Sequence, residues 1–96
     1  MIEMDSADLT NEEREEACAF VNNSGYDPKR VKHSFQVRPA LGETLMFSFD
    51  HYRYDENGKM VIGYHTALTD PIVIYASDRL GWFQHYLTRT GRTIDD

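Results

Sequence analysis

The fold of this chain is decided by residues 44–68, which read TLMFSFDHYRYDENGKMVIGYHTAL. Near the centre of the stretch lies Asn57-Gly58, and Asn-Gly is the dipeptide most typical of a two-residue turn between antiparallel strands. Apolar and polar residues alternate before it, as in a strand with one buried face. The stretch therefore predicts a β-hairpin with strands at 44–54 and 59–68.

The apolar pattern favours one register for this hairpin. A two-residue loop at Asn57-Gly58 gathers most of the apolar side chains on one face, namely Leu45, Phe47, Phe49, Ile62, Tyr64 and Leu68. The same register places Asp50 opposite His65, with their Cβ atoms about 5 Å apart. A three-residue loop with a bulge mixes the apolar and polar groups, and a one-residue shift inverts every side chain. We therefore expect the two-residue loop.

A helix is predicted between Thr10 and Gly25. Thr10 and Glu13 have the spacing of a capping box, in which each side chain accepts a hydrogen bond from the other residue's backbone. Gly25 suits the left-handed conformation that ends many helices. Residues 1–9 show no clear periodicity, and we expect them to be flexible.

Two further strands and a second helix are predicted beyond this helix. Residues 31–38 alternate in polarity, with His33 on the apolar side, and form a half-buried strand. Residues 72–76 are apolar throughout, which is typical of a central or doubly covered strand. Ser77 then predicts the start of a helix that ends at Gly91.

The predicted fold class is α+β, in a single domain over residues 1–96 with the element order α-β-β-β-β-α. Hairpins between neighbouring strands make the sheet of about four strands mainly antiparallel, and an N-terminal and a C-terminal helix flank it. We expect a turn at residues 69–71 and a short tail at 92–96. A chain of 96 residues with 41% hydrophobic residues has room for one core.

All of the net charge of −6 belongs to the first sixteen residues. They contain seven carboxylates and one base, Arg14, whereas the other eighty residues contain nine acids and nine bases. A neutral body with one acidic end indicates a surface that presents charge to a partner.

An acidic helix face is the first candidate binding site. If the helix extends back to about Asp5, one face carries Asp5, Asp8, Glu12 and either Glu15 or Glu16. Carboxylates one helical turn apart are about 5–6 Å from each other, which is close to the phosphate spacing along one nucleic-acid strand. The alternative is a solvated first turn in which the helix dipole favours negative charge.

Trp82 and Tyr86 are the second candidate binding site. They are four residues apart on the predicted C-terminal helix, and Arg79 and Arg89 flank them. Aromatic and Arg side chains are enriched at the centres of protein interfaces. The two rings fit the core of a small protein equally well, so both interpretations stay open.

No motif in the sequence defines a catalytic or cofactor site. Asp50 and His65 form a carboxylate–imidazole pair that resembles half of a hydrolytic site, but such a pair is also ordinary on a wet sheet face. The four histidines lack a metal-binding spacing, and no glycine-rich loop is present to bind phosphate. We expect no cofactor and no metal.

Composition indicates a cytoplasmic protein that does not bind nucleic acid directly. Cys18 is the only cysteine, so no internal disulfide forms. The N-terminal residues lack the basic start of a signal peptide, and no apolar run is long enough for a membrane span. The sequence pI is about 5.1, whereas nucleic-acid-binding domains are usually basic.

The sequence favours a non-enzymatic interaction module that inhibits a larger basic protein. The expected partner is an enzyme or complex that handles nucleic acid, because its basic surface complements the acidic end. Anti-CRISPR and anti-restriction proteins of phages and nuclease immunity proteins belong to this physical class. The alternative is a small hydrolase or ligand-binding domain that uses the Asp50/His65 face. The sequence does not indicate an oligomeric state.

Overall fold

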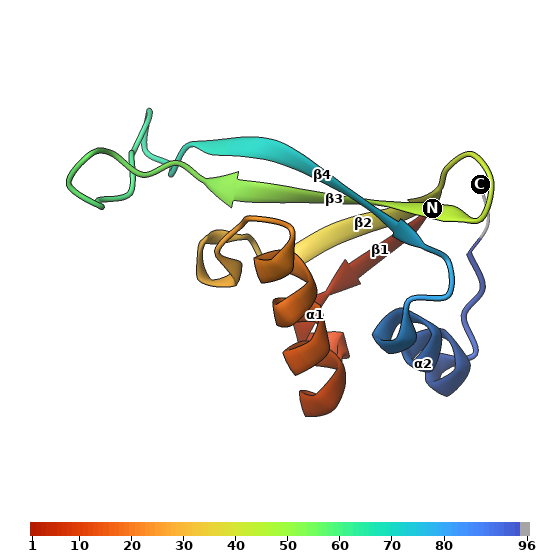
Figure 1. The fold of residues 1–96 in the computed structure, drawn as a ribbon. Coiled ribbons are helices and arrows are strands. Elements are labelled where there is room, and N and C mark those ends of the chain that lie inside the picture. Colours follow the sequence, from red (N-terminus) through yellow and green to blue (C-terminus); the bar gives the residue numbers. More distant parts are fainter. Residues whose placement is uncertain (95–96) are drawn as a thin grey trace.

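A computed structural model describes residues 1–94 as one four-stranded antiparallel sheet with two helices on one of its faces (Figure 1). The strands lie in the order β1-β2-β3-β4. The elements are β1 (Ile2–Asp5), η1 (Ser6–Asp8), α1 (Asn11–Asn23), η2 (Pro28–Arg30), β2 (Ser34–Pro39), β3 (Thr44–Tyr52), β4 (Thr69–Ser77) and α2 (Gly81–Thr90). This arrangement confirms the predicted α+β class. Residues 95–96 of the predicted tail lie outside the described residues.

The N-terminal residues form a strand, so the expectation that residues 1–9 are flexible is wrong. Ile2 and Met4 are buried while Glu3 between them is exposed. Four residues are too few for the alternation to be recognised in the sequence, yet they complete the sheet beside β2. The order of elements is therefore β-α-β-β-β-α, with the first strand preceding α1.

The prediction of a hairpin between residues 44–54 and 59–68 is wrong. Leu45, Phe47 and Phe49 of β3 face the core, as expected, but their partners are Ala76, Ile74 and Ile72 of β4. Residues 53–68 are instead a long connection between these strands, and it extends beyond the sheet (Figure 1). The β3–β4 pairing joins nine residues of each strand, which outweighs the local preference of one Asn-Gly dipeptide.

The Asn57-Gly58 turn does form inside this connection, with a different loop length. Tyr54 bridges Met60, and Gly58 has a φ of +77°. The loop therefore has the three-residue geometry with a left-handed glycine, which the apolar pattern disfavoured. The pattern misled because Ile62 and Tyr64 are exposed and contribute nothing to the core.

β4 begins at Thr69 and is an edge strand, so the predictions of a turn at 69–71 and of a central or doubly covered strand at 72–76 are wrong. Its residues alternate, with Ile74 buried and Val73 and Tyr75 exposed on the outer face. Proline is tolerated at position 71 because it exchanges no hydrogen bond with its partner Asp50. The backbone carbonyl of Asp50 instead accepts from the Lys32 backbone N–H on the β2 side. The Pro71 nitrogen therefore points away from β3.

A bulge precedes β2 and changes the direction of His33. Gln36 pairs with Ser48, but Val31 pairs with His51, so two additional residues lie on the β2 side between these pairs. Such a bulge interrupts the alternation of side chains. Val31 remains buried while His33 is exposed, and the expectation of a histidine on the apolar face is wrong.

The core lies between the inner face of the sheet and the two helices. Trp82 is at its centre, with ring centroids 5.6 Å from Phe47, 5.9 Å from Phe83 and 6.0 Å from Phe20. The predicted capping box of Thr10 and Glu13 is present. Helix α2 ends at Gly91 as predicted, but it begins after Leu80, since the Ser77 hydroxyl accepts from the Arg79 backbone in a separate turn.

Candidate acidic interaction surface

The strand register gathers carboxylates on the outer face of the sheet. Asp5 pairs with Ser34 and Glu3 with Gln36, and Asp50 follows two residues after Ser48 on the same face of β3. These residues line a hollow of about 570 Å³, which we call the acidic hollow. Its lining consists of Glu3, Met4, Asp5, Asp8, Ser34, Phe35, Gln36, Ser48, Phe49, Asp50 and Pro71.

The acidic hollow contains four carboxylates and no base. None of its lining residues is Lys or Arg, so no cation of the hollow itself neutralises the formal charge of −4. Glu3 and Asp50 are exposed, and neither carboxylate hydrogen-bonds within residues 1–94. Both carboxylates are therefore free to meet a partner's cations.

Asp5 and Asp8 are held in place by the backbone around η1. The Asp5 carboxylate accepts the Ala7 backbone N–H at 2.9 Å and the Ser34 hydroxyl at 3.2 Å. The Asp8 carboxylate accepts the Asp5 backbone N–H at 3.3 Å. The bond from Ala7 is the main reason that the pKa of Asp5 is lowered. Asp5 consequently stays ionised at neutral pH.

The continuous acidic helix predicted from Asp5 does not form. Asp5 lies at the end of β1 and Asp8 in η1, and α1 begins only at Asn11. Glu12, Glu15 and Glu16 are exposed on α1, where i,i+3 and i,i+4 spacing puts them on one side. The predicted partner-binding residues therefore form two groups, one in the acidic hollow and one on α1, rather than a single row with phosphate spacing.

Glu13, by contrast, is buried in the contact between the two helices. Its carboxylate accepts from Arg89 Nε at 3.1 Å and Nη2 at 2.8 Å, from the Thr10 backbone N–H at 2.9 Å, and contacts the imidazole of His85. The Arg89 hydrogen bond, followed by that from Thr10, outweighs burial and lowers the pKa of Glu13 to about 2. Sequence reasoning missed the contact between the helices because His85 and Arg89 are more than 70 residues from Glu13.

Trp82 and Tyr86 are core residues and do not form an exposed binding stripe. Both side chains are buried, with 3% and 2% of their surfaces exposed. The aromatic side chains of β3 and α1 pack around Trp82, and the Tyr86 hydroxyl accepts from Arg92 at 2.6 Å. The prediction that these two residues contact a partner is wrong, because a partner cannot reach either ring while α2 packs against the core.

The proposed pair of Asp50 and His65 is also absent. Asp50 lies opposite Pro71 in the sheet, and His65 is in the 53–68 connection with a φ of +69°. The predicted pairing depended on the hairpin register that the β3–β4 ladder replaces. Within residues 1–94, no three His, Cys, Asp or Glu side chains are grouped so that they could hold a metal ion.

Comparisons with known proteins give no relative from which a function could be transferred. No family model, curated protein or solved structure matches the chain. Neither helix in the described part of the chain combines the length and apolar content that a membrane span requires.

Proposed function

We propose that this protein is a non-enzymatic interaction module that binds the basic surface of a larger protein through the acidic hollow. The observation that carries the proposal is the group of four carboxylates, Glu3, Asp5, Asp8 and Asp50, in one hollow without a Lys or Arg in its lining. Clustered charge of one sign steers an oppositely charged partner into contact and raises the association rate.

The partner class that fits best is an enzyme or complex that handles nucleic acid. Such proteins hold phosphates in grooves lined with Lys and Arg, and a carboxylate-lined surface competes for the same side chains. The exposed glutamates of α1 (Glu12, Glu15 and Glu16) extend the negative field without being part of the hollow. Occupation of such a groove would inhibit the partner without any catalytic step.

Two double variants, each of which removes two negative charges, distinguish the contribution of the acidic hollow from that of the other carboxylates. Glu3→Gln with Asp50→Asn removes two charges inside the hollow, and Glu15→Gln with Glu16→Gln removes two charges on α1. All four side chains are exposed, and none makes a hydrogen bond within residues 1–94, so each double variant should fold. Losing a desolvated ion pair typically costs about 2–5 kcal/mol of binding free energy.

The experiment is affinity capture from lysate on each immobilised form, with elution by salt and by a double-stranded DNA or RNA oligonucleotide. We expect the original protein and the α1 variant to retain a basic protein that the oligonucleotide displaces, and the hollow variant to lose it. Equal capture by all three forms at low and high salt, or capture that nucleic acid does not displace, would contradict the proposal.

A further inference from the structure

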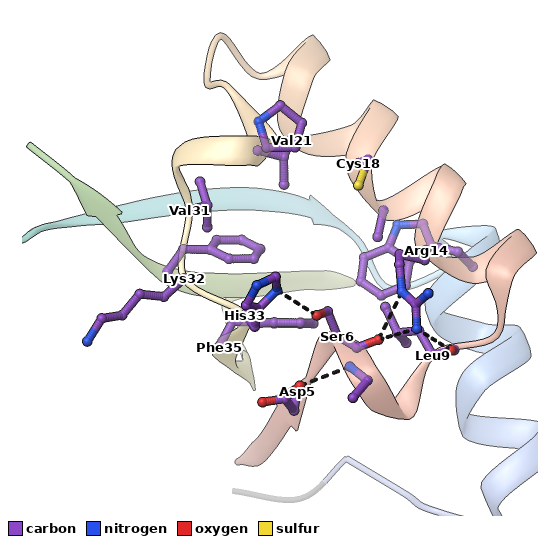
Figure 2. A pocket seen from close by; sticks show the side chains of 15 residues that line it. Asp5, Ser6, Leu9, Arg14, Cys18, Val21, Val31, Lys32, His33 and Phe35 are labelled. Atoms are coloured by element: carbon purple, nitrogen blue, oxygen red, sulfur yellow. Dashed lines mark hydrogen bonds between the residues drawn. The ribbon is translucent and has the colours of Figure 1, made fainter. Parts of the chain in front are cut away.

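A second hollow lies between α1, η1 and the segment that leads into β2. Its volume is about 520 Å³, within the range of roughly 300–1,000 Å³ typical of small-molecule sites. We call it the apolar cavity (Figure 2). Most of its wall is hydrophobic and consists of Ala7, Leu9, Ala17, Val21, Pro28, Val31, Phe35, Phe49 and Trp82.

Trp82, which lines the apolar cavity, carries an unsatisfied polar group. The Nε1–H of Trp82 is buried and has no hydrogen-bond partner, and it is the one such side-chain atom within residues 1–94. Native proteins rarely leave a buried donor without an acceptor. Because this nitrogen is not accessible from the cavity, only the hydrophobic part of the indole contributes to the wall, and a pocket with such a wall is typical of a small-molecule site.

Hydrogen-bond donors and positive charge gather along one edge of this cavity. Ser6 and His33 contact each other, Oγ to Nδ1, at 2.9 Å, and Figure 2 shows them beside Arg14. When the Ser6 hydroxyl donates to Nδ1, the proton of His33 lies on Nε2, which has no partner in the described residues. Arg14 is held against this edge by the Ser6 and Leu9 carbonyls, at 3.1 and 3.2 Å.

The charge balance at this edge is opposite to that of the protein as a whole. Arg14 and Lys32 are the bases of the lining and Asp5 is its one acid, in a chain of net charge −6. The Lys32 side chain extends outward from the cavity (Figure 2) and is exposed. Its flexible stem allows the ammonium group to fold over a ligand at the mouth.

We propose that the apolar cavity binds a small molecule with a hydrophobic body and a single carboxylate, such as a medium-chain fatty acid. The body occupies the hydrophobic wall against Phe35, Phe49 and Trp82, and the carboxylate meets the edge formed by His33, Arg14 and Lys32. The apolar cavity shares Asp5, Phe35 and Phe49 with the lining of the acidic hollow, but it selects an anionic amphiphile rather than a cation, and the proposal does not depend on the proposed function.

Two residues in the lining of the cavity can report on binding. Trp82 is the only tryptophan and Cys18 the only cysteine, and both line the apolar cavity. Binding is measured from the emission of Trp82 during titration with decanoate, decanol and decyltrimethylammonium below their micellar concentrations. Protection of Cys18 from alkylation by a maleimide gives an independent reading.

We expect decanoate to shift the Trp82 emission saturably and to slow alkylation of Cys18. It should bind at least about threefold more tightly than decanol, the gain typical of one exposed charge pair, and the cationic detergent should bind more weakly than both. Failure of decanoate to bind, or equal binding of decanoate and decanol, would overturn the proposal.

Matched variants test the two halves of the site. Lys32→Gln should remove most of the preference for decanoate over decanol, whereas Lys29→Gln, at an exposed lysine outside the lining, should leave it unchanged. Ala17→Phe fills the cavity and should abolish binding. If this variant does not fold, Cys18→Phe blocks the mouth from an exposed position, with Ala19→Phe on the same helix as the control. Unchanged affinity in folded Ala17→Phe and Cys18→Phe would also overturn the proposal.

Discussion

Glu13 shows how one side chain can serve two levels of structure. Through Thr10 it completes a local helix cap, and through Arg89 it joins the first helix to the last. Only 2% of its surface is exposed, so its charge is tolerated because hydrogen bonds surround the carboxylate. The same carboxylate therefore stabilises α1 by itself and α1 against α2.

Replacing Glu13 by Gln should destabilise the protein by about 2–3 kcal/mol, since it removes a charge-assisted hydrogen bond and leaves Arg89 with a weaker partner. Glu12→Gln, at the exposed neighbouring position, should change stability by less than about 0.5 kcal/mol. Urea unfolding of both variants measures the difference. Equal midpoints would mean that the contact between Glu13 and Arg89 contributes nothing to stability.

The same residue makes the protein sensitive to acid. The pKa of Glu13 is about 2 in the folded state, against an ordinary value of 4.5. Because the folded pKa is lowered, the stabilisation is fully present above pH 4.5 and is lost as the pH falls towards 2. The loss amounts to roughly 3 kcal/mol. Urea unfolding at pH 7, 4.5, 3 and 2 should show this slope, and Glu13→Gln should flatten it.

At the scale of elements, β1 is a structural strand whose removal should be costly. Met4 is buried against the sheet with 3% of its surface exposed, and truncation of such a side chain typically costs about 2–5 kcal/mol. Met4→Ala should therefore lower the unfolding free energy by this amount. Met60→Ala, in the exposed connection, is the control and should have little effect. An unchanged unfolding free energy in Met4→Ala would mean that β1 contributes little to the stability of the protein.

The elements that could be predicted from the sequence are those defined by local chemistry. The box of Thr10 and Glu13 and the left-handed Gly25 and Gly91 mark helix ends, because capping involves residues within one turn. Helix identity, strand alternation in β3 and the fold class followed from the same local patterns.

The errors concern pairings between distant segments. The choice of β4 rather than residues 59–68 as the partner of β3 depends on a ladder closed across a 16-residue connection, which no local pattern reveals. The predictions of a continuous acidic helix and of an exposed Trp82 and Tyr86 were wrong for the same reason. Trp82 and Tyr86 are buried by contacts across the core, and the acidic hollow exists only because β1 places Glu3 and Asp5 near Asp50 of β3.

For the molecule as a whole, the uneven charge should make stability depend on salt. The acidic hollow and the glutamates of α1 repel each other at low ionic strength, and salt screens this repulsion over about 10 Å at 0.1 M. The melting temperature should therefore rise between 10 mM and 500 mM NaCl. The double variant Glu3→Gln with Asp50→Asn should show a smaller rise. A melting temperature that falls with salt would mean that favourable ion pairs affect stability more than the repulsion between the carboxylates.

The edge position of β4 has a consequence for the behaviour of the protein at high concentration. Val73 and Tyr75 turn their backbone N–H and C=O groups away from β3, and beside them Pro71 has no N–H to offer. A strand from a second molecule that approached this edge would lose one bond of its ladder at the proline. Pro71 thus hinders fibril growth along this edge, although the exposed side chains of Val73 and Tyr75 favour such growth.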